Sequence, residues 1–138
     1  MSGTTADHSH GDRLDLTAAA GAVGRGRDFA EQILLRLGWL PTGEPTARRT
    51  ADDVLLLVSE LVTNACRHGA APYRLLLRAT GDGLRIEMTD AGSHLPVVGP
   101  DQPAVPGGFG MRLIAALADT WGVIEHPHGK TVWLEVTR

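Results

Sequence analysis

The stretch SELVTNACRHG, Ser59 to Gly69, closes a long apolar run, VLLLVSELV, and sets Glu60, Asn64 and His68 four residues apart. A step of four returns almost to the same face of an α-helix, so the three polar side chains form one stripe. The neighbouring positions are apolar nearly all round, which predicts a mostly buried helix. A buried carboxylate must be paired, coordinated or neutralised, which points to a functional stripe. A stripe that simply faces solvent is the alternative.

The composition is that of an ordinary soluble globular protein. Of the 138 residues, 43% are hydrophobic and 21% are charged. The formal net charge of -3 gives no electrostatic footprint for nucleic acid. The single cysteine, Cys66, excludes an internal disulfide and favours a reducing compartment. With neither a secretory signal nor a membrane-length apolar run, the sequence predicts a cytoplasmic protein without a nucleic-acid or membrane partner.

The first residues are small and polar, and we expect 1–12 to form a mobile tail before a single domain over 13–138. Two histidines in this tail, His8 and His10, could bind a metal ion. Two solvated side chains are the more ordinary interpretation of histidines in such a tail.

Apolar periodicity predicts three helices and five short strands. The helices are expected around 27–37, 46–67 and 110–120, and Gly69 marks the end of the second. The strands are expected around 14–16 and at 73–79, 84–90, 121–126 and 130–136, with TGDG as a hairpin turn after the second. This order predicts an α+β sandwich whose helices pack on one face of a mainly antiparallel sheet.

A lone carboxylate ends one of these strands. Asp90 has the strand parity of Leu84, Ile86 and Met88, so it should point to the core-facing side. Ala-Gly follows, and backbone can approach a ligand closely over a glycine. A carboxylate there can accept a hydrogen bond from a buried donor such as the amino group of a base. A turn or cap residue is the structural alternative.

A glycine-rich segment, PGGFGMRLI, places Gly107, Gly108 and Gly110 directly before an apolar helix. Exposed N–H groups at a helix start, approached over glycine, suit phosphates. The preceding residues, 91–107, contain four prolines and can hardly form a regular element. A loop that long in a compact domain is usually functional or disordered.

Together these segments resemble a known family. ELVTNACRHG is similar to the N box of the GHKL ATPase/kinase superfamily, and DAG (Asp90 to Gly92) to its first glycine box. GGFGMRLI resembles the second glycine box, and GKTVWLEV the closing G-T segment. Their order and spacing over about 14–137 are most similar to bacterial anti-sigma factor serine kinases and related ATP-binding regulators of actinobacteria.

The resemblance implies a Bergerat fold, a two-layer α/β sandwich with a mixed, mainly antiparallel sheet, that binds ATP and Mg²⁺. Asn64 would then coordinate Mg²⁺, Glu60 would act as general base on the acceptor hydroxyl, and Asp90 would accept the adenine amino group. The walls of the nucleotide site would come from Gly92, Gly108 and Gly110, and 91–107 would be the lid.

Two further site residues carry open alternatives. Arg112 is the nearest cation to the lid and a candidate for the γ-phosphate; an ordinary exposed helix residue is the alternative. Thr131 would assist Asp90 at adenine, yet it shares the strand parity of Trp133 and Glu135 rather than that of the core residues. Either the strand pairing is bulged or Thr131 makes no such contact.

The family implies a protein serine/threonine kinase that phosphorylates an anti-anti-sigma partner of the STAS type and sequesters a sigma factor. It also implies a homodimer. The alternative is a nucleotide-binding interaction switch with little or no kinase activity. The proline-rich lid favours it, as does the first glycine box, which lacks a clear second glycine because SHLP follows Gly92.

Overall fold

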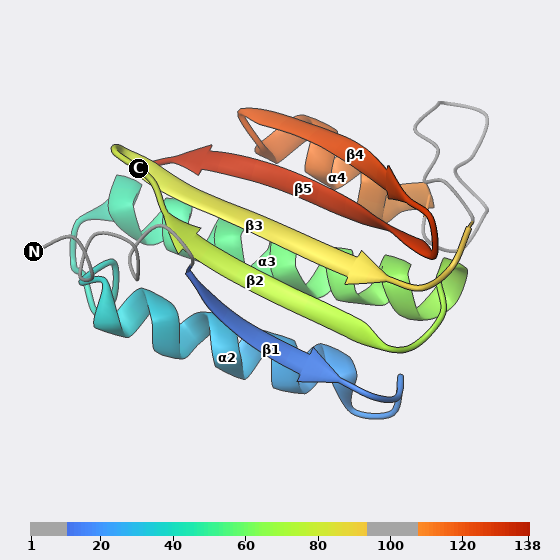
Figure 1. The fold of residues 1–138 in the computed structure, drawn as a ribbon. Coiled ribbons are helices and arrows are strands. Elements are labelled where there is room, and N and C mark those ends of the chain that lie inside the picture. Colours follow the sequence, from blue (N-terminus) through green and yellow to red (C-terminus); the bar gives the residue numbers. More distant parts are fainter. Residues whose placement is uncertain (1–10, 94–107) are drawn as a thin grey trace, which may run out of the picture.

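The structure, a computed structural model, describes residues 11–93 and 108–138, and the helices and strands follow one another as β-α-α-β-β-α-β-β (Figure 1). In chain order they are β1 (Asp12–Leu16), α2 (Ala22–Arg36), α3 (Pro45–His68), β2 (Tyr73–Ala79), β3 (Gly83–Asp90), α4 (Gly108–Leu117), β4 (Thr120–His126) and β5 (Gly129–Thr137). His8, His10 and most of the predicted tail lie outside the described residues, whereas Asp12 already belongs to the sheet.

The five strands form one sheet in the order β1-β2-β3-β5-β4. Each of the four pairings is antiparallel, including that of the edge strand β1 with β2. Strands β2 and β3 form the predicted hairpin, in which Ala79 pairs with Leu84. The central pair, β3 with β5, runs in continuous register from Gly83 opposite Thr137 to Asp90 opposite Lys130.

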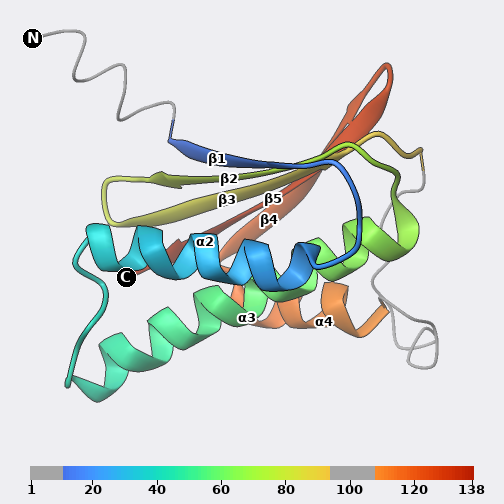
Figure 2. The same ribbon diagram turned by 90° about the horizontal axis from the view of Figure 1, so that it is seen from below.

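The three helices lie on one side of the sheet, so the molecule has two layers (Figure 2). This arrangement confirms the predicted α+β sandwich. Helix α2 packs on α3 and approaches it closely at Gly26, where a side chain would meet Val62 at 3.1 Å. Helix α4 packs on the other flank of α3. Within the described ranges, no helix is long and apolar enough to cross a membrane.

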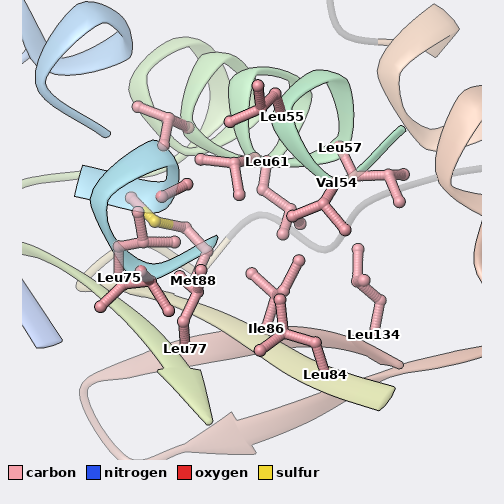
Figure 3. Close-up of a cluster of buried hydrophobic side chains, with 14 of the residues drawn as sticks. Val54, Leu55, Leu57, Leu61, Leu75, Leu77, Leu84, Ile86, Met88 and Leu134 are labelled. Carbon is pink, nitrogen blue, oxygen red and sulfur yellow. The ribbon is translucent and has the colours of Figure 1, made fainter. Parts of the chain in front are cut away.

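The core lies between α3 and the sheet, and its side chains come from both layers (Figure 3). From α3, Val54, Leu57 and Leu61 point toward the strands. The sheet contributes alternate residues of each strand, because successive side chains of a strand point to opposite faces. Those labelled in Figure 3 are Leu75, Leu77, Leu84, Ile86, Met88 and Leu134.

The observed helix boundaries differ by a few residues from those predicted from apolar periodicity, as expected where capping contacts decide where a helix begins. Helix α3 begins at Pro45 because the carboxylate of Glu44 accepts hydrogen bonds from the N–H groups of Thr46 (3.0 Å) and Ala47 (2.8 Å). Helix α4 begins at Gly108, two residues earlier than predicted, and ends at Leu117 because β4 begins at Thr120.

Candidate functional site

Several predicted site residues meet at one end of the sheet. Strand β3 ends at Asp90, β5 begins at Gly129 and α3 ends at His68. Figure 1 shows these three ends close together, beside the start of α4 at Gly108. The segments that resemble the N box and the two glycine boxes therefore lie at the same end of the sheet.

Asp90 lies at the centre of this end and is almost fully buried, with 3% of its surface exposed. Its Oδ1 accepts hydrogen bonds from the N–H groups of Gly92 (2.7 Å) and Ala70 (3.4 Å). The ammonium of Lys130 lies 3.0 Å from Oδ1 and 2.9 Å from Oδ2. The strand parity predicted that Asp90 faces the core side, and this is confirmed. The carboxylate is held by backbone donors of the α3–β2 and β3–α4 connections and by one cation.

Three glycines from separate segments lie against Asp90, two at its carboxylate and one at its backbone oxygen. A Cβ at Gly69 would fall within 2.4 Å of the Asp90 side chain. A Cβ at Gly92 would lie 3.0 Å from Asp90 Oδ1, and one at Gly129 would lie 2.1 Å from the Asp90 backbone oxygen. The backbone approaches Asp90 this closely only where no side chain intervenes. A side chain at any of these three positions would crowd Asp90, which explains why each of them is a glycine. The predicted wall residue Gly92 contacts Asp90 directly.

Lys130 is the residue of this end that the motif comparison missed. It pairs with Asp90 across the sheet and is 4% exposed. The signal was present in the sequence, because Lys130 has the same strand parity as Val132, Leu134 and Val136 and so belongs to the core-facing side. The family resemblance instead indicated Thr131, the threonine of the G-T segment.

Thr131 points to the opposite face of the sheet from Asp90. Its pairing with Thr89 is in register and without a bulge, which removes the first of the two alternatives left open by the sequence. Its hydroxyl lies 2.7 Å from that of Thr89 and 2.8 Å from Nε2 of His126, both on the outer face. The structure therefore brings Lys130, not Thr131, to the Asp90 carboxylate.

Asn64 is the least satisfied polar residue of the helix layer. Its Oδ1 and Nδ2 are both buried and have no hydrogen-bond partner in the part of the chain that the structure describes. Buried amides normally find partners, because leaving one unpaired costs about 1–3 kcal/mol. The unpaired amide of Asn64 is therefore a candidate contact for a bound ligand or ion.

The stripe containing Asn64 follows α3 from the Asp90 end inward. Glu60 and Asn64 are both half-buried, and they lie one turn apart, about 6 Å along the axis. Asn64 is about 6 Å from His68, the last residue of the helix, along the same axis. The helix therefore places the Asn64 amide nearer to Asp90 and the Glu60 carboxylate one turn further away.

Asn64 fits the magnesium ion that the family resemblance implies. Mg²⁺ is commonly held by one or two protein oxygens together with nucleotide phosphates and water, and Asn64 Oδ1 is such an oxygen. Among the residues of 11–93 and 108–138, no group of three or more His, Cys, Asp and Glu side chains could hold a metal ion by itself. A site made of Asn64 and the phosphates of a nucleotide needs no such group.

The remaining predicted residues belong to α4. Gly108 and Gly110 lie in the first turn of this helix rather than before it, and Gly107 lies outside the described residues. Arg112, one turn further, is half-buried rather than fully exposed. Residues 94–107, most of the predicted lid, also lie outside the described residues.

Cys66 lies near this end but is not set up as a nucleophile. Burial raises the pKa of its thiol, and the negative charge of Asp90 raises it further, against the hydrogen bond with Tyr73, which lowers it. The reactive form of cysteine is the thiolate, which this environment disfavours. Cys66 is therefore a packing residue at the edge of the hydrophobic core.

Comparison with known proteins finds matches that cover most of the chain. The model of the histidine kinase-like ATPase domain family matches residues 16–136. A search of curated proteins finds no match. Among solved structures, the RsbU and RsbW domains of Rv1364c from Mycobacterium tuberculosis match with a TM-score of 0.64 and 19% identity. That match covers 91% of this chain and 32% of the mycobacterial one.

A second solved structure, the Acinetobacter baumannii histidine kinase AdeS, matches with a TM-score of 0.50 and 11% identity, over 99% of this chain and 72% of that one. At these identities both structures are evidence for the fold alone. The chain spans about a third of the length of the mycobacterial chain.

Proposed function

The chain belongs to the histidine kinase-like ATPase domain family, and we propose that it is a protein serine/threonine kinase that transfers the γ-phosphate of ATP to an anti-anti-sigma partner of the STAS type. The single observation that carries the proposal is the orphaned amide of Asn64. Asn64 lies on the same helix as Glu60, the candidate general base, and this helix ends beside the buried carboxylate of Asp90. ATP-dependent phosphoryl transfer needs a ligand for Mg²⁺, a general base and a group that binds the adenine base. The amide of Asn64, the carboxylate of Glu60 and the carboxylate of Asp90 match these three roles.

Asp90 would bind the base of the nucleotide. Its carboxylate is fixed by the N–H groups of Gly92 and Ala70, so it presents oxygens in a set direction without having to reorganise. A buried acceptor that can take one more hydrogen bond favours a ligand with an amino group, because a ligand without one leaves that position unfilled. The adenine amino group supplies the required donor.

Asn64 would hold Mg²⁺ through Oδ1 together with the phosphates of ATP. When bound, the ion neutralises charge on the β- and γ-phosphates. Arg112 and the N–H groups of the first turn of α4 add positive potential for the γ-phosphate. Phosphoryl transfer depends chiefly on positioning and charge, so these residues need to orient the nucleotide rather than react with it.

Glu60 would be the general base. Its carboxylate takes the proton of the serine or threonine hydroxyl of the partner as the hydroxyl oxygen bonds to the γ-phosphorus. The bond between that phosphorus and its bridging oxygen to the β-phosphate breaks, and ADP leaves. The half-buried position of Glu60, one turn from Asn64, keeps the base beside the phosphate end of the site.

Two observations support a STAS-type partner and a role in sigma-factor control. The motifs of the sequence are most similar to those of anti-sigma factor serine kinases, and a solved structure with RsbU and RsbW domains shares the fold. In such a system the kinase would bind a sigma factor while its STAS partner is phosphorylated or absent. We also propose a homodimer, as the family resemblance implies.

The test is transfer of ³²P from [γ-³²P]ATP to purified STAS-domain proteins encoded in the genome from which the chain comes. We expect one of them to be labelled on serine or threonine in the presence of Mg²⁺. Glu60→Gln should bind ATP as the parent does and lose labelling by roughly 100-fold or more, the usual contribution of a general base. Glu31→Gln, at an exposed position of α2, is the matched control and should label the partner normally.

Equal labelling by Glu60→Gln would show that Glu60 is not the base. ATP binding without labelling of any STAS protein would instead support the interaction switch that the proline-rich segment 91–107 favours.

A further inference from the structure

Lys130 is the only lysine of the chain; every other basic residue among the 13 is an arginine. It is also the only cation among the buried polar residues of the described ranges. Lysine is a compact ammonium with three rotatable N–H donors, whereas arginine offers a rigid planar fork. A lone lysine at this buried position therefore raises the question of what its N–H groups serve.

Counting hydrogen bonds around Asp90 shows where a ligand could still bind. Oδ1 has three donors, the N–H groups of Gly92 and Ala70 and the Lys130 ammonium. Oδ2 forms an ion-pair contact with the same ammonium at 2.9 Å. A carboxylate oxygen accepts about two hydrogen bonds, so Oδ2 has room for one more. The ammonium directs N–H groups at both oxygens and keeps a third.

We propose that Lys130 and Asp90 together recognise the Watson–Crick edge of adenine. The carboxylate accepts a hydrogen bond from the N6 amino group at Oδ2, and the Lys130 ammonium donates its third N–H to the neighbouring ring nitrogen N1. Lys130 is thus a specificity-determining residue for the nucleotide base. The inference rests on the proposed function, because it concerns the same ATP site.

The chemistry of the two partners matches. On adenine, a donor (N6) and an acceptor (N1) are neighbours, and on the protein an acceptor (Oδ2) and a donor (Nζ) are neighbours 2.9 Å apart. The ammonium also balances the charge of the carboxylate, so a neutral base meets a pair of zero net charge. A buried donor or acceptor discriminates strongly, because a ligand that lacks the complementary atom leaves it unpaired.

Binding of ATP and of 1-deaza-ATP, in which a C–H group replaces N1, tests the proposal. With Mg²⁺ present, wild-type protein should bind ATP roughly tenfold or more tightly than 1-deaza-ATP, as expected for a hydrogen bond from a charged donor. Lys130→Met should bind ATP more weakly and reduce this preference to about one, while Lys130→Gln, which keeps a donor, should retain part of it. Arg25→Met, an exposed residue of α2, is the control and should keep the wild-type ratio.

A second measurement uses the wild-type protein and so does not depend on the folding of a variant. Protein labelled with ¹⁵N-lysine gives one Nζ signal, because the chain has one lysine. ATP should shift this signal, and 1-deaza-ATP at saturation should shift it much less. An equal shift with both nucleotides, or no shift during saturation with ATP, would overturn the assignment of Lys130.

The outcomes separate the two proposals. A folded wild-type protein that binds neither nucleotide contradicts the proposed function and this inference with it. ATP binding with the same preference over 1-deaza-ATP in wild type and Lys130→Met leaves the function intact and overturns the role of Lys130. Tighter ATP binding by Lys130→Met would also overturn it, since the ammonium would then compete with the base for Asp90.

Discussion

The carboxylate of Asp90 fills the space that a side chain on Gly69 would need, because a Cβ there would lie 2.4 Å from both Cγ and Oδ1 of Asp90. Gly69, the first residue after helix α3, therefore packs directly against Asp90, the last residue of strand β3. This contact ties the helix that carries Glu60 and Asn64 to the carboxylate assigned to the base, so the two halves of the site keep a fixed relation.

Gly69→Ala should damage both stability and binding. The new methyl group must push Asp90 aside, and overpacking of this kind costs about 1–3 kcal/mol of unfolding free energy. Gly24→Ala is the matched control, because Gly24 is exposed in α2 with no atom within 4 Å of its Cβ position. That control should stabilise the helix by about 0.5–1 kcal/mol. Urea denaturation of both variants checks the prediction, which equal effects of the two changes would contradict.

Asn64→Leu should stabilise the nucleotide-free protein. Leucine is close to asparagine in size and removes two buried polar atoms that lack partners among the described residues. The expected gain is about 1–3 kcal/mol, the cost of an unpaired buried group. Thermal unfolding without nucleotide measures it. A clear loss of stability would mean that the amide is satisfied in the free protein and would remove the main support for the metal assignment.

The buried pair of Asp90 and Lys130 should show strong coupling. Their side chains are 2% and 6% exposed, so removing one charge leaves the other buried without its partner. Asp90→Asn and Lys130→Met should each destabilise the fold by about 3–5 kcal/mol. The double variant should lose much less than the sum of the two, because neither charge remains. Additive losses in a double-mutant cycle would show that the two groups do not depend on each other.

Cys66 should alkylate slowly in the native protein. Burial and the nearby Asp90 raise the pKa of its thiol, so at pH 8 less thiolate is present than in a free cysteine. The rate with iodoacetamide should rise with pH through the raised pKa, and unfolding in urea should accelerate it at constant pH. The chain has one cysteine, so mass spectrometry reads the reaction directly. Native and unfolded protein reacting at the same rate would contradict the assignment.

Much of the fold could be predicted from the sequence because its patterns are local. The alternation in LRIEMTD places Ile86 and Met88 in the core and Asp90 on the same side, and all three are buried. The spacing of Glu60 and Asn64 predicts a shared helix face, and both are half-buried on α3. Helix starts were harder to predict, since Glu44 caps α3 through a side-chain contact that periodicity does not reveal.

The site was only partly predictable, because its details depend on contacts across the sheet. The family motif predicted Thr131 as the neighbour of Asp90, whereas strand parity argued against Thr131. The register of β3 with β5 places Lys130 opposite Asp90. The orphaned amide of Asn64 could not be foreseen either, because partners from other elements are absent from a linear pattern. Where a motif and strand parity disagree, parity was the better guide here.

The most direct test of the Mg²⁺-ATP site is calorimetric titration of ATP into the purified protein, with Mg²⁺ and with EDTA, beside Asn64→Leu. We expect wild-type protein to bind ATP more tightly with Mg²⁺, and Asn64→Leu to lose most of that difference while remaining folded. If a folded wild-type protein binds no ATP, or if its affinity is the same with and without Mg²⁺, the assignment of Asn64 as the metal and phosphate residue is wrong.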